Sequence, residues 1–174
     1  MKKSIIIFIL IILIYILIGN VIAEKDMIPD EAIRIRVIAN SNSEYDQKIK
    51  NKVKEEVQFD IYNMLKNTKN IEEARVIINN NLNNVENNIY NLLQKEKYEL
   101  PFNINFGLNY FPKKEFKGIT YDEGYYESVV VTLGEGLGDN WWCVLFPPLC
   151  MIEAEESTEV EYTTMVEEII NKYF

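Results

Sequence analysis

Histidine is absent from all 174 residues of the sequence, and cysteine occurs only twice, at Cys143 and Cys150. The missing imidazole removes the commonest general base, the commonest metal ligand and the usual activator of a serine or cysteine nucleophile. Two thiols without further ligands at suitable spacing make a poor zinc site. We therefore expect no catalytic residue, no bound metal and no cofactor.

An excess of positive charge is also lacking, since the formal net charge is −9 at pH 7. Non-specific binding to nucleic acid or to an anionic lipid surface is therefore disfavoured. We expect no nucleic-acid partner and no small-molecule ligand. No internal repeat and no Gly/Ser linker divides the chain, and the roughly 150 residues after the N-terminal segment suffice for one domain with a single core.

The N-terminus has the pattern of an export signal. Two lysines precede an uncharged apolar run (residues 5–18), and Val21 and Ala23 occupy the small-residue positions of a cleavage site. Residues 1–23 are therefore predicted to be a signal peptide. An uncleaved anchor is the alternative, because roughly 20 apolar residues can cross a bilayer. In both cases the rest of the chain lies outside the cytoplasm, and it meets the membrane only through an uncleaved leader. No cysteine lies near the end of the apolar run, so a lipid anchor is not expected.

Hydrophobic periodicity predicts the elements of the exported domain, residues 24–152. Apolar residues alternate in strands and recur every three to four residues in helices. Ser41 with Glu44, and Asn70 with Glu73, have the spacing of helix N-terminal caps. The expected order is a strand (32–39), two long amphipathic helices (from 44 and from 71) and two strands (102–110 and 125–133).

These elements predict an α/β (α+β) fold. Two apolar helix faces need a sheet to cover, so we expect a two-layer sandwich with two long helices packed on a small, mostly antiparallel sheet. Residues 153–174 are predicted to form an acidic tail that ends in a short C-terminal helix.

Residues 134–150, GEGLGDNWWCVLFPPLC, are chemically distinctive. The alternating Gly134, Gly136 and Gly138 permit unusual backbone conformations, so a shaped loop is predicted here in place of a continuing strand. Glu135 and Asp139 would repel a phosphate, and no helix with a Lys-Ser/Thr pair follows, so a phosphate-binding loop is not expected. A plain turn between two strands is the alternative for the glycines.

This segment also holds both cysteines and both tryptophans. In an oxidising compartment Cys143 and Cys150 are predicted to form a disulfide, with free thiols as the alternative. Trp141 and Trp142 point to opposite sides of an extended chain, so one can enter the core while the other anchors a partner; both could also be buried. The predicted partner-binding residues are Gly134, Gly136, Gly138, Asn140, Trp141 and Trp142.

Two stretches resemble a known family. IRIRVIANSNSEYDQKIKNKV (residues 33–53) and YYESVVVTLGEGLGDNWWCVLFPPLC (residues 125–150) are similar to the stage II sporulation protein R family of endospore-forming bacteria. The resemblance implies a non-enzymatic signalling protein, made in the forespore and exported into the intermembrane space. There it would activate a membrane-embedded aspartic protease of the mother cell, which processes the precursor of sigma-E.

Two other functions are consistent with export. A hydrolase of cell-wall glycan would need two carboxylates as acid and base, for which Glu127 and Glu135 are the candidates. A structural protein of the septal space would form ordered assemblies.

Overall fold

The structure is a computed structural model of the chain, and it describes residues 31–116, 119–151 and 159–173. The predicted leader, residues 1–23, lies outside the described residues, as do residues 153–158 of the predicted acidic tail. The described elements are β1 (Ile33–Ile38), α2 (Glu44–Leu65), α3 (Ile71–Lys95), β2 (Phe102–Phe111), β3 (Lys114–Phe116), β4 (Ile119–Tyr121), β5 (Gly124–Leu133), β6 (Asn140–Phe146), the 3-10 helix η1 (Leu149–Met151) and α4 (Glu159–Tyr173).

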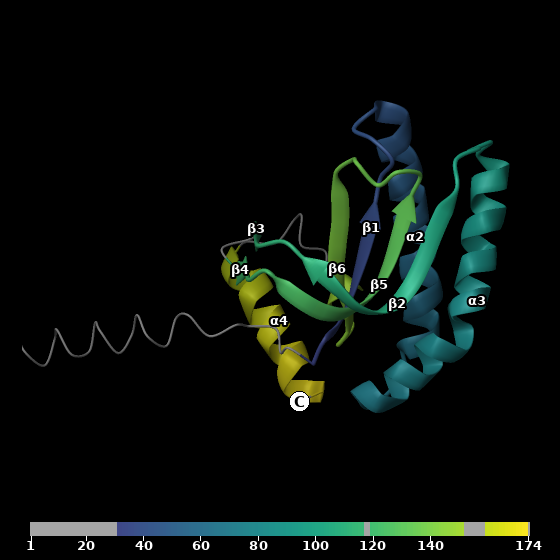
Figure 1. The fold of residues 1–174 in the computed structure, drawn as a ribbon. Helices are drawn as coiled ribbons and strands as arrows, with labels where there is room; N and C mark the ends of the chain where they lie inside the picture. The colour runs from purple at the N-terminus through teal and green to yellow at the C-terminus, as the bar shows by residue number, and fades with distance from the viewer. Residues whose placement is uncertain (1–30, 117–118, 152–158, 174) are drawn as a thin grey trace, which may run out of the picture.

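Four strands form the main sheet, in the order β2-β5-β1-β6. β1 runs parallel to β5 and antiparallel to β6, and β2 runs antiparallel to β5. The helices α2 and α3 lie side by side behind this sheet (Figure 1). The predicted α+β fold, with two long helices on a small and mostly antiparallel sheet, is confirmed.

Caps start the two long helices. Asn70 accepts a hydrogen bond from the Glu73 amide at 2.9 Å, as the spacing predicts. The cap predicted for α2 at Ser41 is wrong, because Ser43 accepts from the Asp46 amide at 3.1 Å. Ser41 instead donates its hydroxyl to the Asp46 carboxylate. The chain therefore enters α2 through two polar side chains rather than one.

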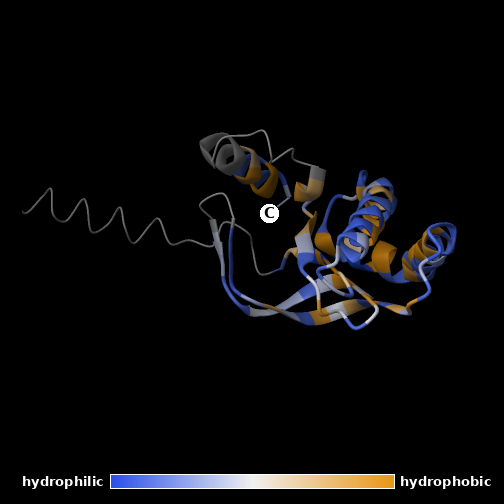
Figure 2. Cartoon of the chain, turned by 90° about the horizontal axis from the view of Figure 1, so that it is seen from above, coloured by the Kyte–Doolittle hydropathy of each residue, from blue (hydrophilic) through white to orange (hydrophobic). Residues whose placement is uncertain are grey.

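The main core lies between the sheet and the helix pair. The strand face predicted to be buried, Ile33, Ile35 and Val37, is fully inaccessible to solvent. Apolar stripes of α2 and α3 cover it, and Figure 2 shows their hydrophobic sides turned toward the sheet. Each such aliphatic side chain contributes about 1.5–3 kcal/mol through burial.

A second, smaller core lies beyond β6. The ends of β2 and β5 extend past the sheet and continue into the β3–β4 hairpin; we call this part, residues 109–126, the arm (Figure 1). Between the arm, β6 and α4 lie the buried residues Ala32, Tyr121, Val144, Leu149 and Val166. The C-terminal helix predicted by the sequence therefore packs on the domain.

The predicted loop over residues 134–150 is wrong in its centre. Asn140–Phe146 form β6, a strand paired with β1. Its side chains alternate, with Trp141 and Cys143 against the main core and Trp142 and Val144 against the second core. Burial on both sides explains why this strand lacks the simple apolar-polar alternation of β1.

Candidate partner-binding surface

The glycine-rich loop, residues 134–139, is built on the segment that leads into α2. The side-chain oxygen of Asn40 accepts a hydrogen bond from the backbone amide of Glu135 at 3.0 Å. The Asn40 carbonyl accepts the Leu137 amide, also at 3.0 Å. Further along, Asn42 accepts the Asp139 amide at 2.6 Å. The two stretches that carry the family resemblance therefore bind each other.

Close packing explains the glycines. Gly134 has φ +55°, in the left-handed region, and a Cβ there would overlap the Asn40 side chain. At Gly138 a Cβ would overlap the Ser41 backbone. Gly136, with φ +66°, turns the chain beside Thr132. All three glycines serve the shape of the loop, which is preorganised by its contacts with Asn40, Ser41 and Asn42 before α2.

Asp46 fixes the base of this loop. Its buried carboxylate accepts Asn40 Nδ2 at 2.9 Å and Ser41 Oγ at 2.5 Å. The hydrogen bond from Ser41 lowers the pKa of Asp46 below 3.8, against the opposing effect of burial. The carboxylate therefore stays charged and holds the two side chains that position the glycine loop.

Trp142 belongs to the second core. Its indole makes edge-to-face contacts with Phe111, at 5.5 Å between ring centroids, and with Tyr121, at 5.1 Å. Lys114 Nζ lies 5.2 Å from the same ring. Trp142 therefore attaches the arm to β6.

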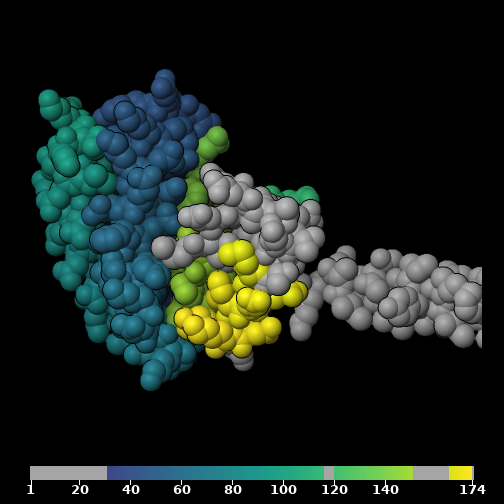
Figure 3. Space-filling model, turned by 180° about the vertical axis from the view of Figure 1, so that it is seen from behind, coloured from purple at the N-terminus to yellow at the C-terminus, as the bar shows by residue number. Residues whose placement is uncertain are grey.

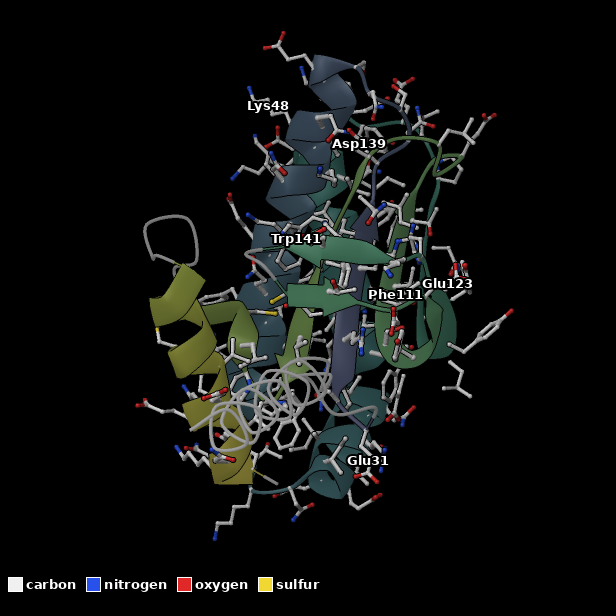
Figure 4. The ribbon with its side chains drawn as sticks, turned by 90° about the vertical axis from the view of Figure 1, so that its left-hand side faces the viewer. Glu31, Lys48, Phe111, Glu123, Asp139 and Trp141 are labelled. Atoms are coloured by element: carbon white, nitrogen blue, oxygen red, sulfur yellow. The ribbon has the colours of Figure 1, made fainter. Side chains whose placement is uncertain are left out.

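Trp141 lies on the opposite side of β6, as the alternation predicts, and faces α2. It is partly exposed, and Lys54 Nζ of α2 lies 5.5 Å from its ring. Figure 4 shows Trp141 between α2 and the arm, and Figure 3 shows a strip of the segment around β6 exposed beside α2. Asn140, opposite Ile38 at the start of β6, is also partly exposed. Both indoles are partly exposed, but the Trp142 ring is held by Phe111, Tyr121 and Lys114, so Trp141 is the candidate anchor.

Four cations surround the tryptophan pair, and we call them the cationic cluster. They are Lys50 and Lys54 of α2, Lys114 of β3 and Arg36 of β1. Burial lowers the pKa of Lys50, and Lys54 and Lys114 lower it further while Asp139 opposes them. Burial and Arg36 likewise lower the pKa of Lys114. Lys54 thus lies beside Trp141, and Lys114 and Arg36 lie beside Trp142, so cations gather at the tryptophan pair in a chain whose net charge is −9.

The sequence did not predict this cluster. Lysine stands at every second position from Lys48 to Lys54, so the lysines are spread around the helix and their spacing alone marks no site. Only the fold shows that Lys50 and Lys54 turn toward β6 and that the arm brings Lys114 to them.

The two cysteines meet beside β6. Both are thiols in this structure, and Cys150 Sγ donates to the Val144 carbonyl at 2.9 Å. Burial, and then a hydrogen bond with Cys143, raise the pKa of the Cys150 thiol well above its usual value. The thiol of Cys143 on β6 therefore contacts the thiol of Cys150 on η1. The disulfide between them stays a prediction.

The carboxylates considered for a hydrolase are not brought together. Glu127 lies on β5 and forms an ion pair with Arg75 of α3, with Nε–Oε2 at 2.9 Å. Glu135 follows the far end of β5, and six residues of strand at about 3.3 Å each place it roughly 20 Å away. Acid-base pairs of glycosidases lie within about 10 Å, so this pair cannot act on one bond.

In the described ranges, no group of three or more His, Cys, Asp or Glu side chains is placed to hold a metal ion. Among the helices of the same ranges, none is both long and apolar enough to cross a bilayer.

The fold and this surface define a small α+β domain with an aromatic and positively charged face. The chain belongs to the stage II sporulation protein R family, whose model matches residues 29–156. It is 38% identical over 135 residues to stage II sporulation protein R of Bacillus subtilis (strain 168). The matched residues make up 78% of this chain and 60% of that relative. The chain thus spans less than two thirds of the relative's length. No solved structure matches the chain.

Proposed function

We propose that this protein is an exported signal of sporulation that switches on a membrane protease. In this proposal it is made in the forespore, crosses the forespore membrane and acts in the intermembrane space. Its partner is a membrane-embedded aspartic protease of the mother cell, which then processes the precursor of sigma-E. Membership of the family supports the role in sporulation, and the resemblance of residues 33–53 and 125–150 supports the finer steps.

One observation carries the proposal of a binding role. Trp141 is a partly exposed aromatic residue on a strand, held beside a loop that is itself fixed to the segment before α2. Preorganised aromatic side chains of this kind lose little conformational freedom when a partner docks. The cationic cluster would attract an acidic region of the partner. Elsewhere the net negative charge of the chain would repel such a region, so docking is directed to this face.

The test is reconstitution. The purified protein is added to the membrane protease in proteoliposomes together with the sigma-factor precursor, and cleavage is followed against protein concentration. Trp141→Ala should raise the concentration needed for half-maximal cleavage by at least about tenfold, as for a binding anchor worth about 2 kcal/mol. Its melting temperature should change little.

Trp142→Ala is the matched control. Loss of its contacts with Phe111 and Tyr121 should lower stability by roughly 3–5 kcal/mol, so any loss of cleavage should follow the loss of folded protein. If Trp141→Ala activates the protease normally, Trp141 is not the anchor. If the wild-type protein triggers no cleavage, the proposed function is wrong.

A further inference from the structure

The outer edge of β2 is an unprotected strand edge. β2 ends the sheet order and pairs with β5 in uninterrupted register. Its sequence, FNINFGLNYF, contains no charged residue and no proline. Charges, prolines and bulges are the devices by which proteins normally block such edges. At the other end of the sheet, by contrast, the Val144 carbonyl of β6 is occupied by Cys150 and the arm lies beside the strand (Figure 1).

The register shows which backbone groups point outward. Gly134 N donates to the Pro101 carbonyl at 2.7 Å, so this pair is of the hydrogen-bonded type. Hydrogen-bonded and non-hydrogen-bonded pairs alternate along antiparallel strands. The residues that direct both their N–H and C=O groups away from β5 are therefore Phe102, Ile104, Phe106, Leu108 and Tyr110.

One of these residues already has an outward partner. The Tyr110 carbonyl accepts Arg36 Nη1 at 3.2 Å, which agrees with the direction assigned to it. Within the described part of the chain, the outward groups of Phe102, Ile104, Phe106 and Leu108 have no such hydrogen bond. They form a continuous row of donors and acceptors about seven residues long.

The side chains beside this row suit an extended, uncharged segment. Ile104 and Phe106 are only partly buried against the main core, and Leu108 is 73% exposed. The helix α3 runs behind β2 on the same side as these apolar side chains (Figures 1 and 2). A strand added to β2 would complete the cover of Ile104 and Phe106, with α3 above it.

We propose that the edge of β2, from Phe102 to Leu108, binds an extended segment of the partner protein as a fifth strand. Strand addition supplies main-chain hydrogen bonds, and alternate apolar side chains supply selectivity. The segment should alternate apolar and polar residues and lack acidic ones, since the chain carries a net charge of −9. This inference rests on the proposed function for the partner, the membrane protease.

A second copy of this chain is the less suitable occupant. Identical strands pair antiparallel about a two-fold axis, which would place both α3 helices on the same side of the joined sheet. Because α3 already runs along this margin of the sheet (Figure 2), the second α3 would meet the first. A single extended segment brings no helix with it.

Two variants at Leu108 test the edge in the reconstituted cleavage assay. Leu108→Pro removes an outward N–H. It leaves the hydrogen bonds between β2 and β5 intact, because the backbone N–H and C=O of Leu108 point away from β5. Leu108→Ala removes a similar part of the exposed side chain and keeps the N–H. We expect Leu108→Pro to need about tenfold more protein than Leu108→Ala for half-maximal cleavage, with equal melting temperatures; tenfold corresponds to about 1.4 kcal/mol.

Hydrogen exchange of the full-length protein gives an independent readout. Addition of the protease should slow exchange at the amides of Phe102, Ile104, Phe106 and Leu108. The inference would be overturned, and the proposed function would stand, if cleavage occurs without this protection and Leu108→Pro and Leu108→Ala need the same protein concentration for half-maximal cleavage. Absence of both cleavage and protection would overturn the two together. Protection that grows with protein concentration alone, with a dimer in sedimentation, would show a second copy at the edge and overturn the inference.

Discussion

At Gly138 the chain passes so close to the Ser41 backbone that no side chain fits between them, whereas a Cβ on Gly107 would meet no atom within 4 Å. The same residue type thus has different consequences at the two positions. One glycine is required by the contact of the loop with the segment before α2, and the other sits on an open strand.

Replacing these glycines should separate the two cases. Gly138→Ala should lower the free energy of unfolding by roughly 1–3 kcal/mol, because the Ser41 backbone must move. Gly107→Ala should leave it unchanged or raise it by a few tenths of a kcal/mol, since alanine restricts the unfolded chain. Urea unfolding measures both. Equal effects of the two substitutions would contradict the contact at Gly138.

Asp46 should make stability depend on pH in the acid range. Its pKa is lower in the folded protein than in the unfolded chain, so it contributes stability above about pH 3.8 that is lost as the pH falls below that value. Asp46→Asn should cost about 1–3 kcal/mol at pH 7 by disturbing the bonds from Asn40 and Ser41. The difference from wild type should shrink below pH 3.8.

Glu44→Gln is the control for this experiment. Glu44 is an exposed acid in the same first turn of α2, so its substitution removes a charge near the helix N-terminus without touching the buried network. Urea unfolding at pH 7 and pH 3 should show a much smaller effect. A loss equal to that of Asp46→Asn would mean that the helix dipole, and not the network, provides the stability.

At the scale of elements, the sequence predicts what is periodic over many residues. The stripes of α2 and α3 and the alternation in β1, β2 and β5 are long enough to assign each element. β6 was missed because three glycines precede its seven residues and two prolines follow them, and because both of its faces are buried. The contacts of Trp142 with the arm, and the cationic cluster, join segments far apart in sequence, which no local pattern reports.

The predicted disulfide belongs to the end of β6 and η1. Cys143 and Cys150 already touch, so oxidation should join them in protein recovered from outside the cytoplasm. The bridge closes a loop of eight residues and should add about 2.5 kcal/mol by the chain-entropy relation. Intact mass before and after reduction and alkylation measures it. Two thiols that alkylate without prior reduction would refute the prediction.

At the scale of the whole molecule, we predict that the leader, residues 1–23, decides where the domain acts. Deleting residues 2–23 should leave a folded protein in the cytoplasm, because residues 32–173 by themselves build both cores. Signalling should be lost, since the protein in the cytoplasm cannot reach the proposed partner, which it meets only in the intermembrane space. Fractionation of cells together with sigma-factor processing measures both results. Full processing with no exported product would contradict the prediction.

The position of β1 affects how such a chain can travel. β1 is the first strand after the leader, yet it lies between β5 and β6, whose residues come about 90 to 110 positions later. A chain that crosses a membrane from its N-terminus therefore brings out its central strand first, with neither neighbour available. Pairing of such distant segments is slow because a long loop must close. If the chain is exported as proposed, this topology would keep the domain open until almost all of it had passed through the membrane, which suits an export channel that accepts only unfolded chains.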